Sequence, residues 1–386
     1  MAKRKDAGHD ETERVLAEME KRIAREYAQA EKELTAKIED YFAKFAVKDE
    51  LKLQGVKNGH ITIQEYQQWR LNQLAVGQRW EDMRNTIVEE MAKANMMANA
   101  VTYGYMPEVY LINFDYGTYQ VEKIAKVDTS FTKYDQATAL RMFQDDEEFY
   151  HQHGWKVGKH INEGKLIPWE KKQAQSIMTQ SILQGESVGK IATRLQKGFG
   201  NSVLKEDIKN WQKMTAEAIS KELARRNRHA SIRNARTMAT GCQNAGRVDS
   251  YKRAEGMGIK LKQEWLATLD GRTRHEHRLL DGQRVEVGKP FVVDGYEIEY
   301  PGDPTAEAHL VYNCRCTLVP VLDGFEVDST DLKLRNTNHM QEESYEEWKE
   351  SHDIHSDPIT KQDEIEKRMK AIYSAEYKSY TKKKKR

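Results

Sequence analysis

The chain has 386 residues, of which 38% are hydrophobic and 32% are charged, and its formal net charge at pH 7 is +1. This balance excludes a global attraction to nucleic acid, and three cysteines in such a length argue against a disulfide framework. The basic start MAKRK precedes no apolar core region, and no apolar run is long enough for a bilayer, so we expect a soluble protein made in the cytoplasm, with no membrane partner.

The low apolar content favours helical structure over one thick globule, and the length allows two or three domains. We predict an α+β fold that is predominantly helical, with long N-terminal helices and a small C-terminal module of short antiparallel strands. The predicted segments are a long helical N-terminal region (1–102), a small aromatic-rich mixed segment (103–165), a helical segment leading into the module (166–260), the module (261–323), and a charged helical tail with a basic C-terminus (324–386).

The first helix is predicted from an apolar stripe whose members step by three and four residues. The stripe consists of Leu16, Met19, Ile23, Tyr27, Ala30, Leu34, Ile38, Tyr41 and Phe45. This stripe either packs on neighbouring helices or docks on a partner protein. Gly55 and Asn58-Gly59 predict a break over Lys52–Gly59, and Thr62 with Glu65 predicts a capping box for the next helix.

Aromatic and β-branched residues then become frequent from Tyr103 to Tyr134. This composition predicts a small sheet or hairpin around Asp115-Tyr116-Gly117. These aromatic residues lack interleaved lysines or arginines, so we interpret them as core. Two further helices are expected over Trp169–Gly185 and Ser187–Lys197.

Arginines gather between Glu222 and Arg253 and make this segment the best local candidate for phosphate contact. They are Arg225, Arg226, Arg228, Arg233, Arg236, Arg247 and Arg253. A solvated helix face is the competing interpretation. The basic C-terminus is a second candidate DNA contact, and the alternative is a purely solvating tail. It comprises Lys382, Lys383, Lys384, Lys385 and Arg386.

The window from Trp265 to Cys316 concentrates turn glycines, histidines and two cysteines. A helical turn or tight loop is expected within Thr273–Leu280, and short antiparallel strands over Arg284–Val287 and Phe291–Tyr300. Tyr300–Pro304 must be a loop, and His309–Tyr312 is expected to run extended into the cysteines.

Cys314 and Cys316 stand at i and i+2, so an extended backbone presents both sulfurs to one side. One zinc ion would accept both thiolates and an imidazole from His275, His277 or His309. The alternatives are two buried thiols or a pair that oxidises. A Cys–His nucleophile is disfavoured, because no segment supplies the oxyanion site it needs.

Several motifs occur in one order between Arg236 and Val321 and resemble the phage Mu F-like head morphogenesis family. The motif residues are Arg236, Thr237, Asn244, Ala245, Gly246, Arg247, Trp265, Asp270, Arg272, Thr273, Arg274, Asp281, Gly282, Pro301, Gly302, Asn313 and Arg315. His275 stands where such proteins usually carry proline, and we take His277 as the motif histidine.

The resemblance implies a structural, morphogenetic minor head protein of a tailed bacteriophage rather than an enzyme. It would associate with the portal protein, with the helical region 1–102 as the possible docking part, and act in head assembly and genome packaging or delivery. The major capsid or scaffold protein and packaged DNA are further expected partners. Its location would be the head interior at the portal vertex, after synthesis in the host cytoplasm. Zinc on His277, Cys314 and Cys316 is the one cofactor considered, and a zinc-dependent enzyme or DNA-processing protein using this cluster is the alternative function.

Overall fold

The computed structural model of the chain describes residues 6–71, 78–126, 205–322 and 344–354, with residues 363, 367, 370 and 371. The helices expected at Trp169–Gly185 and Ser187–Lys197 and the basic end Lys382–Arg386 lie outside the described residues.

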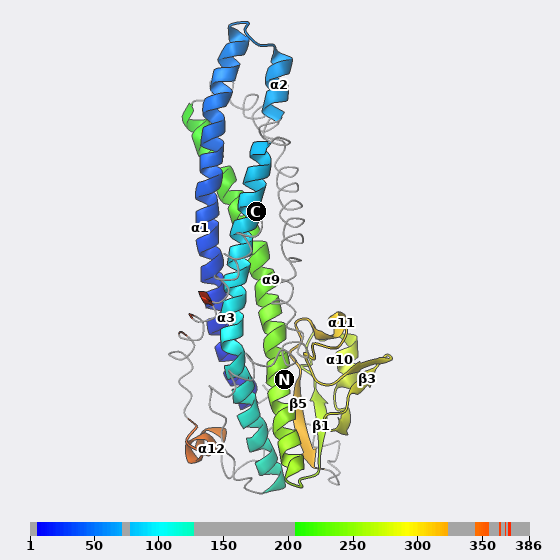
Figure 1. Cartoon of the computed structure of the whole chain (residues 1–386). Helices are drawn as coiled ribbons and strands as arrows, with labels where there is room; N and C mark the ends of the chain where they lie inside the picture. Colours follow the sequence, from blue (N-terminus) through cyan, green and yellow to red (C-terminus); the bar gives the residue numbers. More distant parts are fainter. Residues whose placement is uncertain are drawn as a thin grey trace, which may run out of the picture. The chain divides into compact units, whose positions relative to one another are not determined.

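The chain divides into two compact units. Unit 1 comprises Met1–Arg22, Asn99–Lys156 and Ile232–Arg386, and unit 2 comprises Ile23–Ala98 and Val157–Ser231. Three long helices contribute residues to both units (Figure 1): α1 (Ala7–Lys57), α3 (Gln78–Ala125) and α9 (Lys205–Gly256). The prediction of a mostly helical chain with short antiparallel strands near its C-terminal end is confirmed.

The apolar stripe of the first helix is buried within the chain. Every member from Leu16 to Phe45 is at most 7% exposed. In unit 2 the hydroxyl of Tyr27 lies 2.6 Å from Ser231 Oγ on α9 and donates to Asn95 on α3. The stripe therefore packs on neighbouring helices, and the alternative that it forms the docking face for a partner is wrong.

The turn after α1 follows the capping prediction. The helix continues through Gly55 to Lys57, so the break occurs later than Lys52, at Asn58-Gly59. The Thr62 N–H donates to Glu65 Oε2 at 2.7 Å and the Glu65 N–H donates to Thr62 Oγ1 at 3.1 Å, which completes the capping box of α2 (Ile63–Leu71).

The hairpin predicted within Tyr103–Tyr134 is wrong, because α3 continues through Asp115, Tyr116 and Gly117 to Ala125. This half of the helix is buried on nearly all sides, and even Asn113 is fully buried, donating from Nδ2 to Thr12 Oγ1 at 2.7 Å. A helix without a polar face gives no 3.6-residue period in its sequence, so its aromatic composition resembled that of strands.

The C-terminal module of unit 1 contains a three-stranded sheet and a separate hairpin. The sheet order is β2 (Arg284–Glu286), β1 (Leu261–Leu266) and β5 (Thr317–Leu322), with β1 antiparallel to both neighbours. The hairpin pairs β3 (Phe291–Val293) with β4 (Tyr296–Ile298). Its turn residues Asp294 and Gly295 both have positive φ, +49° and +82°, as a type I′ turn requires.

Two short helices flank the strands. The helical turn predicted within Thr273–Leu280 is confirmed as α10 (His275–Leu280). The extended course predicted for His309–Tyr312 is wrong, because α11 (Ala308–Val311) is helical. Leu310 and Val311 are both buried, and consecutive residues of a strand would have faced opposite sides.

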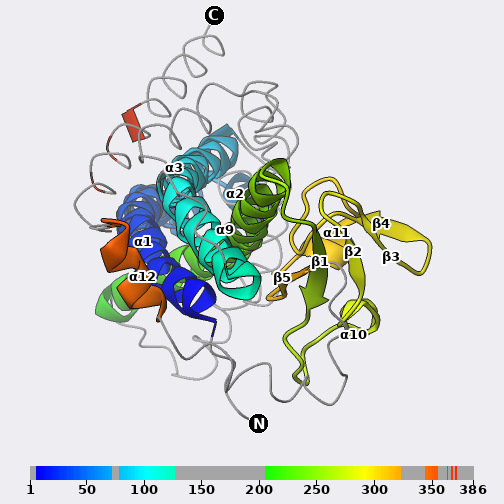
Figure 2. The same ribbon diagram turned by 90° about the horizontal axis from the view of Figure 1, so that it is seen from below.

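A further helix, α12 (Tyr345–Ser351), packs on α3. Tyr345 and Trp348 join Tyr116 and Tyr119 in one buried cluster, and Trp348 Nε1 donates to Glu122 Oε2 at 2.6 Å. Figure 2 shows α12 and β5 on opposite sides of the long helices.

Unit 1 is centred on a fully buried arginine. Arg247 on α9 donates to both carboxylate oxygens of Asp6, at 2.7 and 2.9 Å, to Asn113 Oδ1 at 3.1 Å and to the Leu318 carbonyl at 3.0 Å. Burial raises the pKa of Asp6, but the charge and hydrogen bonds of Arg247 outweigh it and lower the pKa below its usual value. One guanidinium thus holds α3, β5 and the start of α1.

Beside Arg247, α9 approaches α3 closely at Gly246. We predict that Gly246→Ala lowers the free energy of unfolding by about 1–3 kcal/mol, because the added methyl would lie 2.5 Å from the Tyr110 carbonyl oxygen, which cannot rotate away. The methyl group added by Gly256→Ala on the same helix would meet nothing within 4 Å. This substitution should therefore change the free energy of unfolding by less than about 0.5 kcal/mol. Equal losses in a denaturant titration would refute the close approach.

Asp6→Asn should lower the free energy of unfolding at neutral pH by about 3 kcal/mol, because it leaves the Arg247 charge buried without its counterion. The folded-state pKa of Asp6 is depressed, so this stabilisation is complete above the unfolded-state pKa of about 4 and disappears as pH falls through the folded-state value. The difference between parent and variant should therefore shrink in acid.

Glu13→Gln is the control for this substitution. Glu13 lies 3.7 Å from Arg236 in an ion pair whose side chains are about 40% exposed, so its loss should change the free energy of unfolding by less than about 1 kcal/mol. A pH-independent difference between Asp6→Asn and the parent would contradict the ionic role of Asp6.

Candidate functional site

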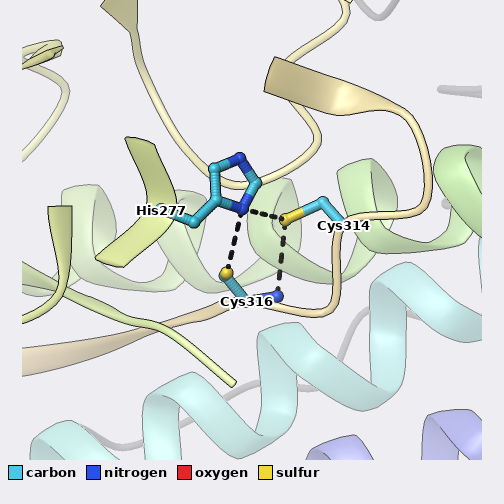
Figure 3. Close-up of side chains that lie close together, drawn as sticks. All are labelled: His277, Cys314 and Cys316. Carbon is cyan, nitrogen blue, oxygen red and sulfur yellow. Dashed lines mark hydrogen bonds between the residues drawn. The ribbon is translucent and has the colours of Figure 1, made fainter. Parts of the chain in front are cut away.

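The structure brings His277, Cys314 and Cys316 together in a buried cluster (Figure 3). His277 comes from α10, and the two cysteines lie in the connection between α11 and β5. The His277 Nδ1 atom lies 3.6 Å from Cys314 Sγ and 3.4 Å from Cys316 Sγ. All three side chains are at most 3% exposed. The predicted same-side presentation of the two sulfurs is confirmed.

The orientation of the imidazole is fixed from its other side. His277 Nε2 lies 2.8 Å from the Leu310 carbonyl oxygen, which only accepts, so Nε2 carries the proton and Nδ1 presents its lone pair to the sulfurs. The ring also meets Trp265 edge to face, with centroids 5.6 Å apart. His275 and His309, the other ligand candidates, are exposed and lie outside the cluster.

The two thiols of the cluster differ electrostatically. Burial, with the hydrogen bond to its neighbour, raises the pKa of Cys314. The hydrogen bond that Cys314 donates lowers the pKa of Cys316. The third cysteine, Cys242 on α9, is buried outside this group, and burial raises its pKa.

The backbone of the cysteine segment is held by a row of polar side chains on α9. Thr237 Oγ1 accepts from the Asn313 N–H at 3.1 Å, and Thr240 Oγ1 donates to the Cys314 carbonyl at 2.8 Å. Asn244 donates to the Cys316 carbonyl at 3.2 Å and accepts from the Leu318 N–H at 3.1 Å. Arg247 completes the row at the Leu318 carbonyl. We call Thr237, Thr240, Asn244 and Arg247 the polar row.

A glycine contact and one further hydrogen bond join the Pro301-Gly302 loop to the same helix. Gly302 has a φ of +84°, and a Cβ on Gly241 would lie 2.8 Å from the Gly302 carbonyl oxygen. Asn244 Nδ2 also donates to the Pro301 carbonyl at 3.0 Å. The family residues Pro301 and Gly302 thus allow the loop to approach α9 closely.

The motif residues of the Asp270 turn enclose the cysteine segment from the other side. Asp270 forms an ion pair with Arg315 at 2.8 Å and accepts from the Arg272 N–H at 2.8 Å, and these hydrogen bonds lower its pKa. Thr273 Oγ1 accepts from the Asp270 N–H at 2.9 Å, and Arg274 donates to the Tyr312 carbonyl.

The remaining motif residues shape the strand junctions. Asp281 accepts from the Ala267 N–H at 2.7 Å, and Gly282 supplies a positive φ of +79°. Trp265 is fully buried. Arg236 pairs with Glu20 of α1 within unit 1. Each of these family residues thus has a structural contact.

Sequence reasoning named Thr237, Asn244 and Arg247 as motif residues, but it missed Thr240 and the row that the four residues form. Its members follow one another on α9 at intervals of three, four and three residues, the spacing of one helix face. That spacing was visible in the sequence, but the extended segment it holds lies more than 70 residues away.

The candidate DNA contacts differ in their surroundings. Arg225 and Arg233 are exposed, Arg228 is half-buried, and the Arg226 side chain is outside the described set. The guanidinium of Arg233 lies 5.7 Å from the centre of the Tyr312 ring. Arg247, by contrast, is fully buried, so it is not accessible to a DNA phosphate.

Chemically, two thiols and an imidazole with one free lone pair form a set of soft and borderline ligands for a cation. Among the described residues, no carboxylate belongs to the cluster.

Residues 172–319 match the family described as Phage Mu protein F like protein. An NAD(+)–arginine ADP-ribosyltransferase EFV of Enterococcus faecalis is 30% identical over 194 residues, which cover 50% of this chain and 34% of that protein. The minor head protein GP7 of Bacillus phage SPP1 is 27% identical over 179 residues, covering 44% of this chain and 48% of that protein. No solved structure matches the chain at a comparable level.

The chain thus spans between a third and a half of the length of these two relatives. None of the helices among the described residues is long and apolar enough to cross a membrane. Residues 172–319 thus resemble the Phage Mu protein F-like family, and 44% of this chain is similar to a phage minor head protein.

Proposed function

We propose that this chain is a structural minor head protein of a tailed bacteriophage, associated with the portal and acting in head assembly and genome packaging or delivery. It resides in the head interior at the portal vertex after synthesis in the host cytoplasm, and major capsid or scaffold protein are its further partners. The observation that carries the proposal is that the family residues form structural joints. Thr237, Asn244 and Arg247 hold backbone atoms, and Gly302 allows close packing.

The proposed portal contact lies near the end of α1 in unit 2. Val47 and Leu51 are each 64% exposed and stand one helical turn apart. Ile63, at the start of α2, is 52% exposed. Since the buried stripe of α1 is already covered, these outward apolar side chains replace it as the docking face for a portal subunit.

Replacing Val47 and Leu51 together by Glu should reduce retention of the chain on purified portal protein at least about tenfold, because two apolar contacts would be lost and two charges desolvated. The matched control is Val292→Glu, which alters an apolar side chain 55% exposed on β3 of the module. Both variants should keep the parent's melting temperature.

Undiminished retention of the double variant would refute this docking face. Point substitutions are a sharper test than deletion of residues 1–60. That deletion would also remove Asp6 and Thr12, which hold α9 and α3 within unit 1.

The second candidate function is that of an enzyme, because one relative is named as an ADP-ribosyltransferase. This chain spans only 34% of that relative, and the described Cys–His cluster has no carboxylate and at most 3% exposure. A buried cluster without a base favours a structural role over substrate turnover.

Contact with packaged DNA is part of the proposal and rests on local charge. If duplex DNA is bound, the affinity should fall steeply with salt, because each neutralised phosphate adds about 0.9 to the slope of log K against log salt. Removing Lys382–Arg386 should then lower that slope by no more than about five. A titration at several salt concentrations measures it, and no binding at micromolar protein would remove DNA from the partners.

A further inference from the structure

The imidazole of His277 lies beside two sulfur atoms, although a single hydrogen bond would use only one of them. Its Nε2 proton is committed to the Leu310 carbonyl, so Nδ1 offers a single lone pair. One thiol proton satisfies that lone pair, yet both Cys314 and Cys316 place their sulfurs within 3.6 Å of it. A cation at the centre of the three atoms would use all of them.

The distances agree with a tetrahedral metal. Zinc–sulfur bonds of about 2.3 Å and a zinc–nitrogen bond of about 2.0–2.1 Å at the tetrahedral angle place nitrogen and sulfur about 3.6 Å apart. The Nδ1–Sγ separations here are 3.6 and 3.4 Å, and all three donor atoms lie within 4.8 Å of one another. Binding therefore needs little rearrangement of the ligands.

The surroundings hold these ligands in place. The Cys316 N–H donates to Cys314 Sγ at 3.4 Å, a contact that favours a thiolate, and the polar row anchors the carbonyl of each cysteine. The Leu310 carbonyl and the Trp265 ring fix the imidazole. Such second contacts are what orient ligands at metal sites.

Charge also favours a divalent ion. Two thiolates, one neutral imidazole and one divalent cation sum to zero, so the complex avoids the large cost of a net charge where every ligand is at most 3% exposed. Either thiolate alone would be a buried unpaired charge. The donor set, two thiolates and an imidazole, is the set that zinc prefers.

We propose that His277, Cys314 and Cys316 bind one zinc ion through Nδ1 and both sulfurs. The ion joins α10 to the connection before β5 and so closes a span of 37 residues within the module. Its role is to stabilise the folded module, because metal binding of this kind is linked to folding. The proposal holds whether or not the chain binds a portal.

The test uses the full chain purified under reducing conditions, with zinc as the probe. Elemental analysis should find about one zinc per chain, or the thiol-reduced chain should take up one. Replacement by Co²⁺ should give a thiolate-to-cobalt charge-transfer band and the intense visible bands of a tetrahedral site. Chelation should lower the melting temperature, and added zinc should restore it.

Cys314→Ser, Cys316→Ser and His277→Gln should each reduce bound metal at least tenfold and abolish the melting shift on chelation. Cys242→Ser is the matched control, because Cys242 is equally buried but lies outside the cluster. It should keep both the metal and the cobalt spectrum.

A parent chain that, with free thiols, takes up neither zinc nor cobalt would overturn the proposal. So would equal loss of metal in Cys242→Ser and in the cluster variants. The cobalt spectrum is recorded on the parent, so the proposal stays testable even if a cluster variant fails to fold.

Discussion

The buried guanidinium of Arg247 is the interaction on which unit 1 depends. An ionised group without solvent exposure is tolerated only when its donors are satisfied and its charge is balanced. Here the partners come from three separate parts of the chain: Asp6 before α1, Asn113 on α3 and Leu318 on β5. If one of these partners were missing, the buried guanidinium would keep an unsatisfied donor or an unbalanced charge. The arginine therefore couples helix packing to the position of the sheet, and through Leu318 to the cysteine segment beside it.

The sequence predicted elements whose signal is local. The stripe from Leu16 to Phe45 carried the helical period, and Thr62 with Glu65 marked a helix start. The helix through Asp115–Gly117 could not be predicted in this way, because a helix buried on nearly all sides has no periodic polar face. Where burial is uniform, composition alone decides the prediction, and aromatic residues then favour strands.

The cluster was predictable in part for the same reason. The i and i+2 spacing of Cys314 and Cys316 is a local property of extended backbone, and it correctly placed both sulfurs on one side. The polar row was not predicted, since Thr237 and Asn244 act on backbone atoms more than 70 residues away. Side chain to backbone contacts of this range leave no complementary pattern in the sequence of the segment that they hold.

That last property assigns different roles to the backbone and the side chains of the cysteine segment. Strands usually hold one another through ladders, but the segment from Asn313 to Leu318 is held along one side by helical side chains that bind its amide groups. Amide groups are the same for almost every amino acid. None of these contacts with α9 therefore depends on which side chains stand at 314, 315 and 316. The fold separates attachment, which uses backbone atoms, from chemistry, which uses the sulfur atoms.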